Sequence, residues 1–252
     1  MRKRYKYKAL MLDVDGTIVP VKDGALPSKR VARAINKAKK HVHISLVTAR
    51  PLFYMNKIFD YLNLSGPSVI NGGSQIIDAK TKEILWEQTI AKDDLSVIIK
   101  TIDNSCDTAI IDNNNRSYHK SEVGSIDKAV KVAIEALSLE QADELLEKLS
   151  KIPTIAVYKS TSFADKKFAL IISHASATKQ HAILEIQKLL NIRTKEMIGV
   201  GDTYNDFPLL MACGFRVAMG NAVDDLKEIA EYIAPPLNKD GVADVIEKFI
   251  LN

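Results

Sequence analysis

The sequence is poor in the features that mark secreted, membrane-spanning and disulfide-rich proteins. Its 252 residues include only two cysteines, Cys106 and Cys213, which form no CxxC pair and have no histidine at metal-ligand spacing. This excludes a disulfide scaffold and favours reduced, buried thiols in a cytoplasmic protein. No apolar run approaches the roughly 20 residues that cross a bilayer, so we expect no membrane segment. The five histidines show no ligand pattern either.

The chain carries only a small excess of positive charge. The formal net charge is +4, and much of the surplus lies in the first eight residues. Such a tail is either a foothold for nucleic acid or a membrane, or a solvated leader. Aromatic residues make up only 6% of the chain, and no second basic cluster interleaved with them supports binding, so we favour the leader. Few apolar residues precede Asp13, so we expect no signal peptide, and we expect neither nucleic-acid nor membrane partners.

The remaining composition, 46% hydrophobic and 26% charged, is typical of a soluble globular protein with a substantial core. Short apolar runs alternate with amphipathic segments in two separated stretches, which predicts a parallel, doubly wound sheet. Between them, neighbouring strands pair and helices follow, which predicts an antiparallel sheet with helices on one face. We therefore predict an α/β fold with a core domain of residues 1–80 and 176–252 and an inserted α/β domain of residues 81–175.

Periodicity and capping residues predict the individual elements. Ser28 is a candidate helix cap, and the Ser138–Gln141 stretch has the form of a capping box. The expected strands are Ala9–Val14, Val42–Val47, Ser68–Ile70, Ser74–Asp78, Glu83–Gln88, Thr108–Asp112, Arg116–His119, Thr154–Lys159, Phe168–Ser173, Glu196–Val200, Phe215–Met219 and Tyr232–Ala234. The expected helices are Ser28–Lys40, Pro51–Leu62, Lys92–Asn104, Ile126–Ala136, Ser138–Leu149, Lys179–Leu190, one from Asn205, Val223–Glu231 and Val242–Ile250.

The strongest chemical signal is the pair Asp13 and Asp15, which follows the buried strand and precedes a glycine turn. Two carboxylates at the carboxyl end of such a strand concentrate negative charge. They predict a positive partner, most simply a divalent cation and a ligand that shares it. One carboxylate of such a pair can attack while the other moves a proton. A plain turn with a helix cap is the alternative.

Polar side chains also follow other predicted strands. Thr48 and Arg50 follow the second strand, Lys179 opens a helix, and Asp202 and Asp206 follow the strand that ends near Val200. In an open parallel sheet, ligands bind outside the carboxyl ends of the strands, so these groups are expected to converge. Hard carboxylate oxygens suit Mg²⁺, and a hydroxyl with an ammonium suits a phosphoryl group. The expected metal residues are Asp13, Asp15, Asp202 and Asp206, with Asp202 a direct ligand and Asp206 orienting a water.

These residues carry a family resemblance. DVDGT at 13–17, Thr48, Lys179 and GDTYND at 201–206 resemble, in order and spacing, the four motifs of the haloacid dehalogenase superfamily in its phosphatase branch. NGG at 71–73, MGNA at 219–222, NKDGV at 238–242 and the insertion between the second and third motifs resemble the Cof-like sugar-phosphatase family. The resemblance implies a Rossmann-like core and a large α/β cap. Ala49 and Gln180 replace usual glycines, which alters the local backbone without removing a catalytic group.

The resemblance also implies roles. Asp13 would attack phosphorus and form an aspartyl-phosphate, and Asp15 would protonate the leaving alkoxide and then activate water. Arg50 fits a salt bridge as well as a phosphate contact, Asn71 fits a plain turn, and Asn205 and Asp206 fit a helix cap. The expected catalytic residues are Asp13, Asp15, Thr48 and Lys179, and the expected phosphate-binding residues are Asp13, Thr48, Arg50, Asn71, Lys179 and Asn205.

The expected function is Mg²⁺-dependent hydrolysis of small phosphate monoesters, sugar phosphates or related metabolites, by a cytoplasmic monomer or small homo-oligomer. A phosphotransferase or phosphomutase and a non-catalytic phosphometabolite-binding protein are the alternatives. The polar loop of residues 112–116 either faces the active site or is a solvent-exposed tip. Hinges of the cap are expected near residues 79–84 and 173–178.

Overall fold

A computed structural model describes residues 6–22, 24–102, 106–161 and 167–252. Most of the basic leader, and residues 103–105 where the helix from Lys92 was expected to end, lie outside the described residues. The chain divides into two compact units: unit 1 is Met1–Trp86 with Thr178–Asn252, and unit 2 is Glu87–Ala177. The first boundary lies beyond the expected residue 80 because the hairpin that includes residues 79–84 belongs to unit 1.

Unit 1 is built on a five-stranded parallel sheet in the order β14-β13-β12-β1-β2. Its central strands β1 and β12 are buried along their whole length, which explains why they are continuous apolar runs. The doubly wound sheet predicted from the sequence is thus confirmed. The strands are β1 (Ala9–Leu12), β2 (His43–Leu46), β12 (Met197–Gly201), β13 (Phe215–Met219) and β14 (Tyr232–Ala234).

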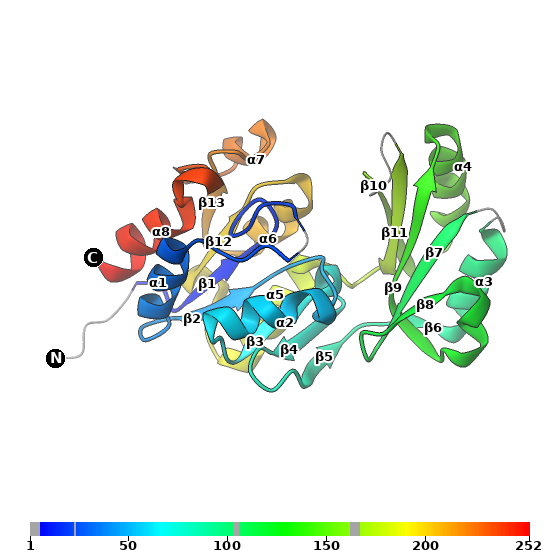
Figure 1. The fold of residues 1–252 in the computed structure, drawn as a ribbon, viewed down its shortest axis with the longest axis horizontal. Helices are drawn as coiled ribbons and strands as arrows, with labels where there is room; N and C mark the ends of the chain where they lie inside the picture. The colour runs from blue at the N-terminus through cyan, green and yellow to red at the C-terminus, as the bar shows by residue number, and fades with distance from the viewer. Residues whose placement is uncertain (1–5, 23, 103–105, 162–166) are drawn as a thin grey trace. The chain divides into compact units, whose positions relative to one another are not determined.

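Helices cover both faces of this sheet (Figure 1). The connection from β1 to β2 runs one way along the sheet and that from β12 to β13 runs the other way, so right-handed crossovers place α1 and α6 on opposite faces. Helix α1 packs against α2 and α8, and α6 packs against α5. The helices are α1 (Lys29–Ala38), α2 (Leu52–Leu62), α5 (Lys179–Leu190), α6 (Phe207–Ala212), α7 (Asp224–Glu228) and α8 (Gly241–Ile246), which a π-helical turn, Glu247–Leu251, continues.

The reversal of strand order between β1 and β12 matters for function. A doubly wound sheet opens a crevice at the carboxyl ends of the two strands where the order reverses, and ligands bind there. Asp13 follows β1, Asp202 follows β12, and the two strands are hydrogen-bonded neighbours. The topology alone therefore brings these two carboxylates together.

A small antiparallel sheet extends unit 1 beyond β2. Strands β3 (Pro67–Ile70), β4 (Gln75–Asp78) and β5 (Ile84–Glu87) pair in that order, and a single bridge between Val47 and Val69 joins β3 to the strand before it. The expected hairpin after residue 73 is confirmed. A 3-10 turn, Asn71–Gly73, follows β3 at the same end of the sheet as Asp13, since the amide of Gly72 donates to the carbonyl of Thr48.

Unit 2 is an antiparallel sheet covered by helices on one face, as predicted (Figure 1). Helices α3 and α4 contact each other and pack on the face that carries Val132, Ile134 and Leu170. Ser138 and Gln141 form the predicted capping box at the start of α4. The elements are β6 (Ile90–Ala91), α3 (Lys92–Thr101), β7 (Asp107–Asp112), β8 (Ser117–His119), β9 (Lys128–Leu137), α4 (Leu139–Leu149), β10 (Ile155–Thr161) and β11 (Phe168–His174).

One predicted element is wrong. The segment 126–136, expected to be a helix, forms strand β9 in the middle of the unit 2 sheet, where it pairs with both β7 and β11. Its β-branched residues Val130, Val132 and Ile134 recur at every second position and are buried, which is the period of a strand. The alanines at 129, 133 and 136, which favour a helix, obscured this alternation. Across the described residues, no helix is both long and apolar enough to cross a membrane.

Candidate active site

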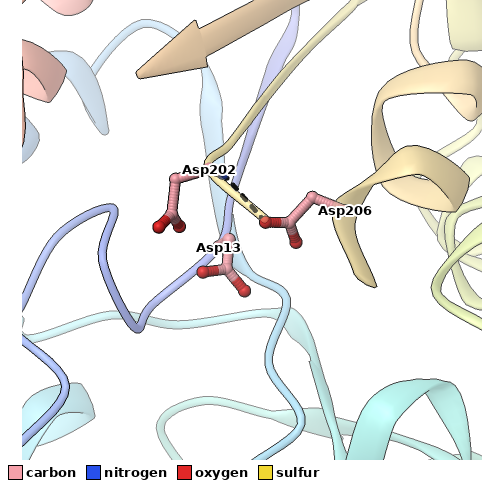
Figure 2. Close-up of side chains that lie close together, drawn as sticks. All are labelled: Asp13, Asp202 and Asp206. Carbon is pink, nitrogen blue, oxygen red and sulfur yellow. Dashed lines mark hydrogen bonds between the residues drawn. The ribbon is translucent and has the colours of Figure 1, made fainter. Parts of the chain in front are cut away.

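Three buried carboxylates gather at the carboxyl ends of β1 and β12. Asp13 follows β1, Asp202 follows β12, and Asp206 closes the 3-10 turn Tyr204–Asp206. One oxygen of each lies within 4.8 Å of the others, and Figure 2 shows Asp13 between the other two. Such a cluster costs free energy unless positive charge accompanies it.

Lys179 supplies part of that charge. Its ammonium donates to Oδ1 of Asp13 at 2.6 Å and to Oδ1 of Asp206 at 2.6 Å, and all three side chains are buried. The lysine is the first residue of α5, which begins where the Thr178 hydroxyl accepts from the amide of His181. One ammonium against three carboxylates still leaves an excess of two negative charges.

The pKa values express this imbalance. Burial raises the pKa of Asp13 well above its ordinary value, Asp206 adds to the rise, and Lys179 opposes it. Burial and Asp206 together raise the pKa of Asp202 to about 6, against a hydrogen bond from Thr17. Burial disfavours the charge of Lys179, but Asp13 and Asp206 more than offset it and raise its pKa. The site therefore holds a charged lysine near two carboxylates, Asp13 and Asp202, whose ionisation is disfavoured.

Hydrogen bonds fix the direction of these carboxylates. Oδ2 of Asp206 accepts from the amides of Asp202 at 2.9 Å and Thr203 at 3.0 Å, so Asp206 shapes the loop after β12 (Figure 2). The hydroxyl of Thr17 donates to Oδ1 of Asp202 at 3.0 Å. Gly16 has φ +81°, and a Cβ there would lie 2.0 Å from Oδ2 of Asp202, so only glycine lets the β1 loop approach so closely.

The cluster fits a divalent cation. Hard carboxylate oxygens are the ligands that Mg²⁺ prefers, and a charge of two matches the negative excess beside Lys179. Both oxygens of Asp206 are already engaged by Lys179 and by loop amides. Asp13 and Asp202 are therefore the residues best suited to contact a metal directly, and Asp206 supports them.

Asp15 lies outside this cluster of three. Its carboxylate accepts two parallel hydrogen bonds from Arg50, 2.8 Å from Nε and 2.5 Å from a terminal nitrogen. Arg50 therefore forms the salt bridge that sequence reasoning allowed as one of two roles. The pair is partly buried, with 14% of the arginine and 32% of the aspartate side chain exposed. Asp15 is therefore not one of the three clustered carboxylates, and its roles as metal ligand and as proton carrier both stay predictions.

Thr48 and Asn71 lie after neighbouring strands of unit 1 and are both buried. The hydroxyl of Thr48 accepts from the amide of Arg50 at 3.1 Å, and a hydroxyl that accepts one bond can still donate one. The amide group of Asn71 donates to the side chain of Gln75 at 3.0 Å, a contact that links the turn to the start of β4. Asn205 is exposed and accepts from the hydroxyl of Thr203 at 2.7 Å, so it braces the turn beside the cluster.

Two residues that shape the site, Gly73 and Asn221, had no role assigned from the sequence. Gly73 has φ +117°, and a Cβ there would lie 2.3 Å from the backbone carbon of Thr178, so the NGG turn seats the start of α5 and with it Lys179. Asn221, in the MGNA segment, donates to the carbonyl of Gly16 at 2.9 Å. The NGG and MGNA motifs marked these positions in the sequence. Their contacts, however, join residues more than 100 positions apart, and a local sequence pattern cannot predict such contacts.

Comparison with known proteins identifies the family of this chain. Residues 10–246 match the family model described as haloacid dehalogenase-like hydrolase. The chain is 26% identical over 99% of its length, and 98% of the relative's, to a 5-amino-6-(5-phospho-D-ribitylamino)uracil phosphatase of Bacillus subtilis (strain 168). It is 24% identical, over 96% of both chains, to phosphoglycolate phosphatase 1 of Saccharolobus solfataricus.

The fold has counterparts among solved structures. A HAD subclass IIB sugar phosphatase, BT4131, superposes with a TM-score of 0.77 at 20% identity, over 96% of this chain and 98% of the other. This likeness shows the shared fold, a parallel sheet core with an inserted α/β domain. The family match spans nearly the whole chain, so the resemblance seen in the motifs is confirmed: the chain belongs to the haloacid dehalogenase-like hydrolase family.

Proposed function

We propose that this enzyme is a Mg²⁺-dependent phosphatase that hydrolyses phosphate monoesters of small metabolites, sugar phosphates among them, with Asp13 as the nucleophile. The observation that carries the proposal is the setting of Asp13. It is a buried carboxylate at the end of β1, 2.6 Å from Lys179 and grouped with Asp202. A phosphate dianion approaching Asp13 meets a fixed positive charge, which a plain carboxylate cluster would not offer.

The first step transfers the phosphoryl group to the protein. An oxygen of Asp13 bonds to phosphorus while the bond from phosphorus to the ester oxygen breaks, and the departing alkoxide takes a proton from the carboxyl of Asp15. Lys179 and the hydroxyl of Thr48 bind the phosphoryl oxygens. Asp13 and Asp202, with Asp206 in support, would hold Mg²⁺, which would supply charge to offset repulsion between the carboxylate and the phosphate.

The second step hydrolyses the aspartyl-phosphate and regenerates the free enzyme. Asp15, now a carboxylate, takes a proton from a water whose oxygen bonds to phosphorus, and the bond between Asp13 and phosphorus breaks to release phosphate. Arg50 holds the Asp15 carboxylate in one orientation through two hydrogen bonds, which places this group for proton transfer in both steps. Arg50 thus acts on the reaction through Asp15.

The substrate class rests on the relatives and on chain order. The two curated relatives are named for phosphorylated small metabolites of different structure, which supports the class and leaves the individual substrate open. Unit 2 is inserted between the segments that carry Thr48 and Lys179, and we infer that it acts as a cap that selects the metabolite and excludes water. The enzyme would act in the cytoplasm as a monomer or small homo-oligomer.

The test is release of phosphate from a panel of sugar phosphates and other small phosphate monoesters, with Mg²⁺ and with a chelator. We expect metal-dependent release by the natural protein and a loss of at least about 10³-fold in Asp13→Asn, which keeps the shape of the side chain but not the nucleophile. Asp112→Asn, a change at a buried carboxylate of unit 2, is the matched control. Full activity of Asp13→Asn would overturn the nucleophile, and no metal-dependent release from any ester would overturn the phosphatase.

The same assay separates hydrolysis from transfer. In water enriched in ¹⁸O, hydrolysis places one solvent oxygen in each released phosphate. A phosphotransferase or phosphomutase would instead pass the phosphoryl group to an added sugar without solvent oxygen.

A further inference from the structure

The MGNA segment, residues 219–222, has no part in the mechanism above, yet Asn221 reaches the site. The nitrogen of its side-chain amide donates to the carbonyl of Gly16 at 2.9 Å and lies 3.4 Å from Oδ2 of Asp202. Its oxygen accepts from the backbone amide of Leu237 at 2.8 Å. One side chain thus touches three segments that are far apart in the sequence.

These three segments follow three different strands of the parallel sheet. Gly16 lies in the loop after β1, Asp202 begins the loop after β12, and Leu237 opens the turn after β14. An amide side chain has two N–H donors and an acceptor on one rigid plane, so asparagine can serve a carbonyl, a carboxylate and an amide at once. Neither aspartate nor alanine offers that combination.

We propose that Asn221 is a positioning residue that aims the Asp202 carboxylate at the metal. This inference rests on the proposed function, because it presumes a cation at Asp13 and Asp202. Asn221 restrains Oδ2 of Asp202, and Thr17 restrains Oδ1 from the other side at 3.0 Å. Groups that hold a metal ligand in orientation typically change metal affinity 10–100-fold when they are removed.

A merely structural role is less consistent with the position of Asn221. The residue is exposed, so its side chain fills no core space. The turn that it anchors at Leu237 has a second attachment, since the hydroxyl of Ser28 donates to Oδ1 of Asp240 at 2.6 Å. Ser28 therefore offers a control: it holds the same turn but touches neither Gly16 nor Asp202.

The experiment measures Mn²⁺ binding by electron paramagnetic resonance without substrate, in the natural protein and in Asn221→Ala, Thr17→Val, the double variant, Asp202→Asn and Ser28→Ala. We expect Asn221→Ala to weaken Mn²⁺ binding about tenfold. We also expect it to raise the KM for metal, but not the KM for the phosphate ester. Ser28→Ala should lower the melting temperature while leaving Mn²⁺ affinity within about twofold. The double variant should weaken binding by less than the product of the single effects, because both residues restrain one carboxylate.

Two kinds of failure are distinguishable. If Asp202→Asn abolishes Mn²⁺ binding but Asn221→Ala binds like the natural protein, Asn221 is only a scaffold residue and the inference is overturned. If the natural protein binds no Mn²⁺, or Asp202→Asn binds it equally well, the metal site of the proposed function is wrong and the inference falls with it. Thr17→Val tests the premise even if Asn221→Ala folds poorly, because it removes the other restraint on Asp202 by a nearly isosteric change. If this variant binds Mn²⁺ like the natural protein, restraint of the Asp202 carboxylate does not govern metal affinity and the inference is overturned.

Discussion

Asp112 in unit 2 and Asp202 in unit 1 are both buried carboxylates at the end of a strand, with 7% and 6% of each residue exposed. Their surroundings are opposite. Asp112 accepts from the amides of Asn114 and Arg116 through Oδ1 and from the hydroxyl of Tyr118 through Oδ2. Two backbone amides of its own turn and the hydroxyl of a tyrosine in β8, all of them neutral, therefore satisfy its charge.

Asp202 has other carboxylates as its near neighbours. Asp206 and burial raise its pKa to about 6, and the hydroxyl of Thr17 offsets only part of that rise. Burial alone therefore does not identify a carboxylate that takes part in chemistry. A buried carboxylate with a complete set of local donors organises a turn, whereas one that shares its space with like charges requires a cation.

The largest expected effect separates the two residues directly. Asp202→Asn should lower kcat/KM with Mg²⁺ at least about 10³-fold, because a metal ligand is lost, while Asp112→Asn should change hydrolysis of a small aryl phosphate less than about threefold. The effects on stability should be the reverse of the effects on activity. At pH 7.5 without metal, Asp202→Asn should stabilise the protein. Asp112→Asn should destabilise it by about 1–3 kcal/mol, measured by thermal unfolding. Equal effects of the two changes on activity would contradict the assignment of Asp202 to the metal site and of Asp112 to a structural turn.

A second prediction concerns pH. The pKa of Asp202 is raised from an ordinary 3.8 to about 6, so between these values the folded protein holds a proton that the unfolded chain has lost. The contribution of Asp202 to metal-free stability therefore falls as pH rises through this window, by at most about 3 kcal/mol, and is constant above it. Mg²⁺ binds the ionised form, so the rise in melting temperature that it causes should be small at pH 5 and large at pH 7.5. A rise that is equal at both pH values would contradict the raised pKa.

A third prediction concerns Asp15, whose charge is satisfied by a side chain rather than by a turn. Arg50→Met should lower kcat/KM about 10–100-fold, and Asp15→Asn should lower it further. If Arg50 acts only through Asp15, the double variant should be no worse than Asp15→Asn. An additive loss in steady-state kinetics would instead indicate that Arg50 binds the phosphate independently.

The smallest expected effect tests the local donors of Asp112. Tyr118→Phe removes one of its three donors and should destabilise unit 2 by about 0.5–1.5 kcal/mol without changing Mn²⁺ affinity. Urea unfolding, monitored by hydrogen exchange of the backbone amides in β7 and β8, would measure this loss of stability. A loss of metal affinity in this variant would show that the two regions are not independent.

Much of the fold could be predicted from local pattern. Helix α5 begins and ends where expected because Thr178 caps its start and Asn191, with φ +50°, ends it in the left-handed conformation. Strand β9 could not be predicted, because alanines beside Val130 and Val132 fit a helix equally well until β7 and β11 pair with it. Tertiary pairing overrode the local preference there.

The candidate site divides in the same way. Asp13 and Asp202 could be named because each follows a strand, and the carboxyl ends of parallel strands meet at one edge. Thr48 and Lys179 were singled out by their match to the motifs of the family that the chain resembles. Asn221 could not be named, because its importance lies in contacts with Gly16 and Leu237 rather than in its neighbours in the chain.

Periodicity, caps and residue type are local properties, so the amino-acid sequence alone indicates which chemical groups stand at the ends of the strands and where most helices and strands lie, with β9 as the exception. Which groups become partners depends on the folded structure. Lys179 lies between Asp13 and Asp206 although 166 residues separate it from Asp13, and Arg50 pairs with Asp15 rather than joining the cluster. Partnership depends on distance and burial in the folded sheet, and these exist only once β1, β2 and β12 lie side by side.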